Sequence, residues 1–192
     1  MSQNKPPAYP ERLYANDLQA ILFDETTIQD RVCALANQIN VAYAESKLTV
    51  IAIANGALIF TADLIRKLNL PVRFDCIHVS SYQNQTTPLN APKIMSNIRL
   101  NVKDANILLI DDILDTGNTL SKVLETLWNM RPISMKTCVL LDKKSRRSID
   151  IEADFVGFEI PDEFVVGYGL DYAEDYRQLP YIGVLKKELQ LI

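Results

Sequence analysis

The sequence predicts an α/β fold with a doubly wound, mainly parallel twisted sheet. The first observation is a series of short apolar, partly β-branched runs, which are typical of strands buried on both faces of a parallel sheet. The second is that two of these runs lead through a short polar loop into a stretch with helical spacing, as crossover connections require. The strands expected on this basis are 48–54, 71–81, 94–100, 107–111, 136–142, 154–160 and 164–169.

Length and composition restrict the class of protein. The 192 residues fit a single domain, and a hydrophobic content of 48 % is sufficient for a sizeable core. The net charge is −4 and the only basic cluster is residues 143–147, which argues against a nucleic-acid partner. No apolar run approaches the ~18 residues of a membrane span, and the first residues lack a signal-peptide core. A cytoplasmic protein without membrane attachment is therefore expected.

Cysteine and histidine usage narrows the chemistry further. Cys33, Cys76 and Cys138 are widely spaced within apolar patterns, so we expect reduced thiols in the core. His78 is the single histidine, and histidine triads and multi-histidine metal sites are thereby nearly excluded.

The first half of the chain is expected to form a helix and a strand-loop-helix unit. Residues 1–10 are polar and proline-rich, as in an arm or a disordered tail. Thr26 and Gln29 have the spacing of a capping box, and apolar residues follow it at helical spacing (Ile28, Val32, Leu35, Ile39, Ala42 and Tyr43). Strand 48–54 then leads through Asn55-Gly56, which could also be a simple tight turn, into a helix bearing Leu58, Ile59, Leu64, Ile65 and Leu68.

A long polar stretch follows the second expected strand. Residues 83–92 contain Pro88 and Pro92 and show no periodicity, and such a loop in a compact domain is usually a lid or disordered. The next strands, 94–100 and 107–111, are expected to flank a turn at 103–104.

The run Ile107 to Leu120 (ILLIDDILDTGNTL) carries the clearest chemical signal. We expect the acidic residues Asp111 and Asp112 to end a buried strand, and a helix to start near Leu120 after a loop of residues 115–119. Open α/β sheets bind ligands at such a carboxyl edge. A helix N-terminus favours anions, and the loop adds a permissive glycine and two hydroxyls. The carboxylates suit sugar hydroxyls or magnesium, so the run describes a site for a phosphorylated ribose.

Three other interpretations share parts of this pattern. Any strand-to-helix connection is polar, so a loop without a ligand stays open. A Walker B strand also ends in acidic residues, but the chain contains no GxxxxGK[ST]. The triplet Asp115-Thr116-Gly117 also occurs in aspartic proteases, whose two carboxylates share a proton. That fold is all-β, whereas a helical pattern follows this triplet (Leu120, Val123, Leu124 and Leu127).

The remaining segments are less specific when taken alone. Pro132 is expected to end the helix, and strand 136–142 precedes a run of charge at 143–147 that would ordinarily be solvated. Phe164 could be a core residue, and Asp171 and Arg177 lie in a loop whose plain interpretation is polar surface.

The run at 107–120 resembles the phosphoribosyl-pyrophosphate (PRPP) motif of type I phosphoribosyltransferases, in the form typical of hypoxanthine-guanine phosphoribosyltransferases. Residues 154–185 (DFVGFEIPDEFVVGYGLDYAEDYRQLPYIGVL) resemble the same family, and the similarity spans roughly 48–185. It implies one domain over 1–192, with a small hood formed by the N-terminal segment and about 154–192. It also implies Mg2+-dependent transfer of 5-phosphoribosyl from PRPP to hypoxanthine or guanine, giving IMP or GMP and pyrophosphate, in a homodimer or homotetramer.

The resemblance also assigns roles. Asp115 is expected to accept the purine N7 proton, with ribose and phosphate bound by Asp111, Asp112 and the loop residues Asp115, Thr116, Gly117, Asn118 and Thr119. The purine is expected at Lys143, Phe164 and Val165, and pyrophosphate at Asn55, Gly56 and Arg177. Ser81 and Tyr82 would belong to a lid. Magnesium ligands would be Asp171, Asp111 and Asp112.

The chain departs from the family pattern at two positions. Asn55 replaces the usual lysine, which leaves a role in pyrophosphate binding to the backbone, and a cis peptide is expected at Ala54–Asn55. Gln83 stands where glycine often follows the lid tyrosine. Two alternatives stay open: transfer to xanthine or another base, and a non-catalytic PRPP-sensing regulator. The base-reading residues and the net negative charge argue against the regulator.

Overall fold

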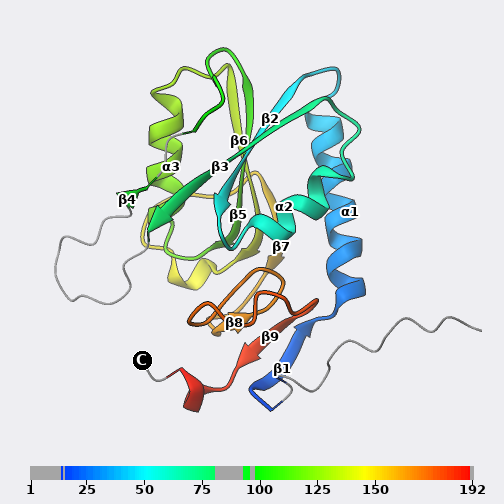
Figure 1. Cartoon of the computed structure of the whole chain (residues 1–192), viewed down its shortest axis with the longest axis vertical. Helices are drawn as coiled ribbons and strands as arrows, with labels where there is room; N and C mark the ends of the chain where they lie inside the picture. Colours follow the sequence, from blue (N-terminus) through cyan, green and yellow to red (C-terminus); the bar gives the residue numbers. More distant parts are fainter. Residues whose placement is uncertain (1–13, 15, 81–92, 96–97, 191–192) are drawn as a thin grey trace, which may run out of the picture.

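A computed structural model of the chain, which describes residues 14, 16–80, 93–95 and 98–190, contains two sheets (Figure 1). The larger sheet has the strand order β4-β3-β2-β5-β6-β7. All of its pairs are parallel except the edge pair β3-β4, which confirms the predicted doubly wound, mainly parallel sheet. Its strands are β2 (Leu48–Ala54), β3 (Val72–Ser80), β4 (Lys93–Ile94), β5 (Asn106–Leu114), β6 (Ser134–Asp142) and β7 (Phe155–Glu159).

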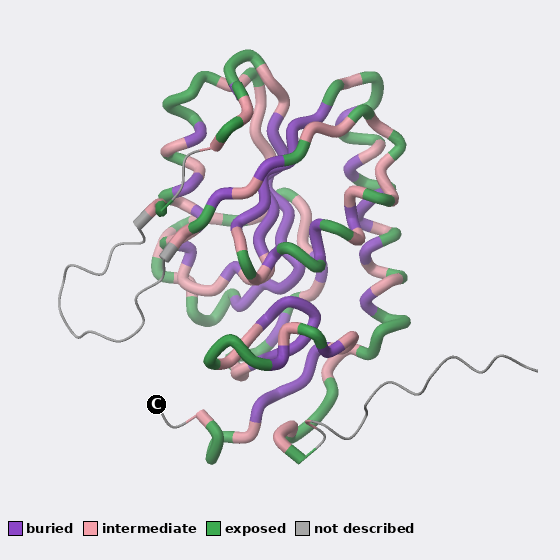
Figure 2. The backbone as a smooth tube through the Cα atoms, viewed as in Figure 1, coloured by how far each residue is buried: buried purple, intermediate pink, exposed green. Residues whose placement is uncertain are grey.

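Helices cover both faces of this sheet (Figure 1). The helices α1 (Glu25–Ala42) and α2 (Leu58–Ile65) pack with Leu108 and Ile110 of β5, whereas α3 (Asn118–Trp128) packs with Ile107 and Leu109. Successive residues of a strand point to opposite faces, so a strand covered on both sides must be apolar throughout. The buried centre of Figure 2 is this sheet. Short 3-10 turns occupy Lys144–Arg146 and Lys187–Leu189.

The start of α1 differs from the prediction. Asp24, not Thr26, is the N-cap, and its carboxylate accepts a hydrogen bond from the N–H of Thr27 at 2.8 Å. The expected capping box is therefore wrong. The side chain of Gln29 does not bond back to the start of the helix. It donates instead to the carboxylate of Asp63 in α2 at 2.8 Å.

Two strand boundaries also differ. β5 does not stop at the acidic pair but continues to Leu114, because Asp111 pairs with Val139 and Leu114 with Asp142 in the ladder with β6. The strand expected over 94–100 is wrong at Met95 and at 98–100, and residues 96–97 lie outside the described part of the chain. The carboxylate of Asp75 accepts the N–H groups of Arg99 at 2.7 Å and Leu100 at 3.1 Å, so a side chain takes the place of a neighbouring strand there.

The smaller sheet lies near the carboxyl edge of the larger one (Figure 1). It is antiparallel, in the order β1 (Leu18–Phe23), β9 (Ile182–Leu185) and β8 (Val165–Val166). The sequence analysis missed β1 and β9 and made β8 too long. Gly167, Tyr168 and Gly169 all have positive φ, which ends β8 early. Since β7 belongs to the larger sheet, the smaller one combines the N-terminal strand β1 with two strands that follow β7 in the sequence.

The cysteines do not share one environment. Cys138 is buried in β6, Cys76 is half-buried and Cys33 is exposed on α1, so the expectation of three core thiols is wrong for Cys33. All three are free thiols. Within the described ranges, no helix is both long and apolar enough to cross a membrane.

Candidate active site

A cleft of about 1280 Å³ opens at the carboxyl edge of the larger sheet. It is lined by the ends of β2, β5 and β6 and by residues 164–177. Ser81 and Tyr82, expected in a lid, lie outside the described residues. Every other site residue predicted from the sequence lines the cleft: Asn55, Gly56, Asp111, Asp112, Asp115, Thr116, Gly117, Asn118, Thr119, Lys143, Phe164, Val165, Asp171 and Arg177.

Residues 115–119, named the 115–119 loop, lead from the end of β5 into the first turn of α3 and line the cleft. Gly117 is the N-cap of α3 with φ of 91°, a conformation that L side chains rarely adopt. A Cβ at this position would lie 2.7 Å from Cγ2 of Ile151. The N–H groups of Asp115, Thr116 and Gly117 donate to no residue in the described part of the chain. The loop thus presents free donors at a helix N-terminus, which is an arrangement that binds anions.

Asp111 and Asp112 form a crowded acidic pair at the end of β5. Asp111 is only 6 % exposed, and its carboxylate accepts the N–H of Asp112 at 3.0 Å. Burial, and then the charge of Asp112, raise the pKa of Asp111 well above its ordinary range. Burial also raises the pKa of Asp112, against the favourable charge of Arg177. A buried carboxylate beside a half-buried one, with little compensating charge, favours a cation or hydroxyl donors as the ligand.

The loop after β2 lies directly against this pair. A Cβ at Gly56 would stand 1.8 Å from Oδ2 of Asp112, so only glycine allows this close approach. The Ala54–Asn55 peptide is cis, which confirms the expectation from the family pattern. Asn55 and Gly56 therefore share one wall of the cleft with Asp112.

The carboxylates fit a magnesium ion that arrives with oxygen-rich substrate. Among the described residues, no group of three or more histidine, cysteine, aspartate or glutamate side chains could hold a metal ion. Asp171 lines the same cleft and is paired with Arg177 at 2.9 Å. Mg2+ commonly binds one or two carboxylates and takes its other ligands from substrate phosphates and water. The donor set is therefore suited to a shared metal and not to a resident one.

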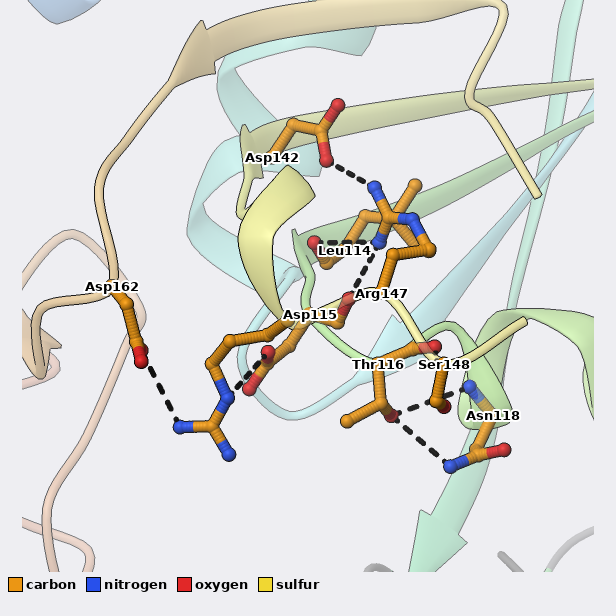
Figure 3. A network of polar contacts seen from close by, with 9 residues as sticks. Leu114, Asp115, Thr116, Asn118, Asp142, Arg147, Ser148 and Asp162 are labelled. Atoms are coloured by element: carbon orange, nitrogen blue, oxygen red, sulfur yellow. Dashed lines mark hydrogen bonds and ion pairs between the residues drawn. The ribbon is translucent and has the colours of Figure 1, made fainter. Parts of the chain in front are cut away.

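Asp115 and Lys143 face the cleft from adjacent strand ends. Oδ1 of Asp115 is buried and accepts no hydrogen bond from the described residues, although Nε of Arg146 lies 3.2 Å away as an ion-pair partner (Figure 3). Lys143 is 5 % exposed. Its burial lowers the pKa of the ammonium group, while the charge of Asp115 acts in the opposite direction. The carboxylate of Asp115 and the ammonium group of Lys143 thus supply a hydrogen-bond acceptor and a donor in the same cleft, and each can bind a ligand atom.

Aromatic rings line the side of the cleft formed by residues 164–177. Phe164 meets Tyr172 edge to face, with ring centroids 5.5 Å apart and an interplanar angle of 90°. The Tyr172 hydroxyl is buried and has no hydrogen-bond partner among the described residues. Next to it, Arg177 pairs with Asp171 and Glu174, each at 2.9 Å.

Residues in and beside this site were not predicted from the sequence, among them Tyr172, Arg146 and Arg147. Tyr172 was overlooked in a loop interpreted as surface. Arg146 and Arg147 were placed in a solvated run, yet Arg146 lines the cleft and the Arg147 side chain is only 14 % exposed. The 3-10 turn at 144–146 curls the run back toward the 115–119 loop. The signal available in the sequence was a charged run placed directly after a buried strand, at the edge where ligands bind.

Comparison with known proteins identifies similar chains. Residues 19–173 match the family model described as phosphoribosyl transferase domain. Hypoxanthine-guanine phosphoribosyltransferase of Bacillus subtilis is 46 % identical over 89 % of this chain and 95 % of its own length. A crystal structure of a hypoxanthine phosphoribosyltransferase from Staphylococcus aureus superposes with a TM-score of 0.90 at 39 % identity, covering 96 % of this chain and all of that one. A ternary substrates complex of the Trypanosoma cruzi enzyme has a TM-score of 0.85 at 36 % identity, with 92 % and 100 % covered.

Proposed function

This chain belongs to the phosphoribosyltransferase family, within its hypoxanthine-guanine branch, and from that premise we propose that it transfers 5-phosphoribosyl from PRPP to hypoxanthine or guanine. The products are IMP or GMP and pyrophosphate. The observation that supports this most strongly is the composition of one cleft. Free N–H donors at a helix N-terminus, an acidic pair, and the Asp115 and Lys143 side chains all line it.

The sugar phosphate would bind along the end of β5. Backbone N–H groups of the 115–119 loop, together with the hydroxyls of Thr116 and Thr119, hold the 5-phosphate. Asp111 and Asp112 accept hydrogen bonds from the ribose hydroxyls. Their raised pKa values support this role, because hydroxyl donors supply the compensation that the pair otherwise lacks.

The purine would bind between Phe164 and the ends of β5 and β6. Phe164 stacks on the ring, the backbone at Val165 meets its edge, and Lys143 donates to the 6-oxo group. The buried Oδ1 of Asp115 accepts the N7 proton as the ring becomes nucleophilic. Nε of Arg146 pairs with this carboxylate oxygen at 3.2 Å.

Pyrophosphate would leave along the opposite wall. Backbone groups at Asn55 and Gly56 and the guanidinium of Arg177 hold it as the bond to the sugar breaks. Asp111, Asp112 and Asp171 are the residues that would hold Mg2+ together with substrate oxygens, and the ion would supply positive charge next to the departing group. The cationic sugar that forms is stabilised by the carboxylates beside it.

Release of pyrophosphate from PRPP and Mg2+ tests this proposal, with each purine offered separately. Hypoxanthine and guanine are expected to be substrates. Adenine places an amino donor against the ammonium of Lys143, and sites built on such a hydrogen bond reject the mismatched analogue by ~10³-fold or more in kcat/KM. Comparable values for adenine and hypoxanthine would contradict the 6-oxopurine assignment. Turnover of xanthine alone would identify a different branch of the family.

A further inference from the structure

The backbone of the 115–119 loop is held by two residues that follow β6 (Figure 3). Nη1 of Arg147 donates to the carbonyl of Leu114 at 3.0 Å and to that of Asp115 at 2.6 Å. Ser148 donates to the carbonyl of Thr116 from its N–H and its hydroxyl, each at 3.0 Å. Three consecutive carbonyl oxygens are therefore bound by one pair of neighbouring residues, which we name the 147–148 clasp.

The guanidinium group of the clasp is itself anchored. Its Nη2 donates to the carboxylate of Asp142, the last residue of β6 (Figure 3). The Asp142 side chain is only 4 % exposed and that of Arg147 14 %. A charge-assisted bond in such a poorly solvated place is stronger than one on the surface. The clasp therefore ties the loop to the rigid end of a central strand.

Peptide geometry transfers this restraint to the cleft. In a planar trans peptide the C=O and the following N–H point in opposite directions. Holding the carbonyls of residues 114–116 therefore sets the directions of the N–H groups of Asp115, Thr116 and Gly117. These are the groups that line the cleft and donate to no described residue.

We propose that Arg147, assisted by Ser148, is a positioning residue that preorganises the N–H groups of the 115–119 loop for the 5-phosphate. The inference rests on the proposed function, since it takes this loop to be the phosphate site. Donors that are already fixed lose little freedom when the ligand binds, so affinity for the phosphate depends on a side chain that does not touch it. The clasp holds carbonyls of residues 114–116 and none of residues 164–177, so we expect its main effect on the phosphate.

The test compares two ligands that differ only in the phosphate, IMP and inosine, by calorimetric titration. Arg147→Met is expected to weaken binding of IMP by about 10- to 100-fold, the effect of losing one or two hydrogen bonds from a charged group, and to leave inosine within about twofold. Arg147→Lys keeps the charge and the bond to Asp142 but cannot span both carbonyls, so an intermediate loss is expected. Ser148→Ala should give a smaller loss, which Ser148→Thr restores.

Arg31→Met is the matched control. The guanidinium of Arg31 also binds consecutive backbone carbonyls, those of Val156 at 2.5 Å and Gly157 at 2.6 Å, but it does so on β7. The Arg31→Met variant should have a lower melting temperature but an unchanged ratio of IMP to inosine affinity. An equal loss for both ligands in Arg147→Met, or the same change of ratio in Arg31→Met, would overturn the inference. If the unsubstituted protein bound IMP no better than inosine, the phosphate assignment itself would fail, and the positioning role with it.

Discussion

The two sides of the cleft are held in place by different means. On the phosphate side, the carbonyls of residues 114–116 are bound by side chains and backbone of a neighbouring segment. On the purine side, many backbone hydrogen bonds hold residues 164–177, and side-chain bonds such as that from Nη1 of Arg177 to the carbonyl of Gly169 at 2.9 Å add to them. The N–H of Tyr168 donates to Leu179 at 2.8 Å, and that of Gly169 to Arg177 at 3.0 Å.

The two sides of the cleft also differ in how many residues have an unusual backbone conformation. Tyr168, Ala173, Glu174 and Tyr176 all have positive φ, so the purine-side segment adopts its path through a series of unusual turns. One side chain that ties it to a helix covering the larger sheet is Tyr168, whose hydroxyl donates to Asp63 of α2 at 2.7 Å. The comparison teaches where single substitutions should matter. We expect function on the phosphate side to depend on a few side chains, because the purine-side segment has many backbone hydrogen bonds of its own.

The strongest test of this contrast is Asp115→Asn. The substitution preserves shape but removes the acceptor of the N7 proton, and a positioned general base contributes ~10²–10⁴ in rate. We expect a loss of that order in kcat, with a smaller change in KM for PRPP, in steady-state assays. Asp150→Asn is the control, because this exposed carboxylate follows the clasp in sequence without lining the cleft. Near-full turnover of Asp115→Asn at saturating substrates would show that the base lies elsewhere.

Lys143→Ala removes the side chain that is proposed to donate a hydrogen bond to the 6-oxo group of the purine. Lys143 directly follows β6, so it lies on the phosphate side of the cleft. Loss of a hydrogen bond from a buried charged group should reduce kcat/KM for hypoxanthine by about 10- to 100-fold and narrow its advantage over adenine. Lys144→Ala is a matched control, since the adjacent lysine is exposed and pairs with Glu159. An unchanged preference for hypoxanthine in Lys143→Ala would mean that another group reads the 6-oxo position.

Asp111→Asn tests whether the charged Asp111–Asp112 pair destabilises the folded protein when no ligand is bound. The pKa of Asp111 is raised in the folded protein, so between the ordinary value of 3.8 and the raised one the folded state binds more protons than the unfolded state. Stability contributed by this group is present below that range and is lost as pH rises through it. Without ligands, Asp111→Asn should therefore raise the melting temperature at neutral pH, by about 2–4 °C per kcal/mol. The gain should shrink as pH falls toward 4.

Asp75→Asn should behave in the opposite way. Burial alone would raise the pKa of Asp75, but N–H groups of Cys76, Leu100 and Arg99 outweigh it and lower that pKa. Its stabilisation is present above the unfolded value and is lost as pH falls through the lowered one. This variant should melt lower than the unsubstituted protein at neutral pH. The same sign for both variants in melts across pH 4–8 would contradict the electrostatic account.

Tyr168→Phe is expected to have the smallest effect. It removes one hydroxyl bond to Asp63, worth about 1 kcal/mol, and should lower the melting temperature by about 2–4 °C. Because the backbone around Tyr168 keeps its own hydrogen bonds, KM for the purine should change by less than about twofold. A tenfold or larger rise in that KM would show that the purine side also depends on single side chains, and the contrast between the two sides would disappear.

Much of the larger sheet could be predicted because its strands have a local signal. β2 occupies 48–54 as expected, and the apolar runs of β3 and β6 lie within two residues of their observed limits. β1 gave no such signal, because its central residues are exposed and its pairing partner β9 lies at the other end of the chain. The prediction of β5 was too short because ladder hydrogen bonds with β6 carry a strand through two aspartates that local propensity would exclude.

The sequence by itself determined the fold class and the chemistry of the 115–119 loop, because both depend on residues that are adjacent along the chain. Only the tertiary structure decided what holds that loop. Arg147 is 32 residues from Asp115, and Asp75 is 24 from Arg99, and no periodicity relates such pairs. A charged run after a strand is equally compatible with solvent and with a buried clasp until the strand order puts acceptors beside it. The physical reason is that burial and hydrogen-bond partners are properties of the packed chain, whereas residue type and spacing are properties of the sequence.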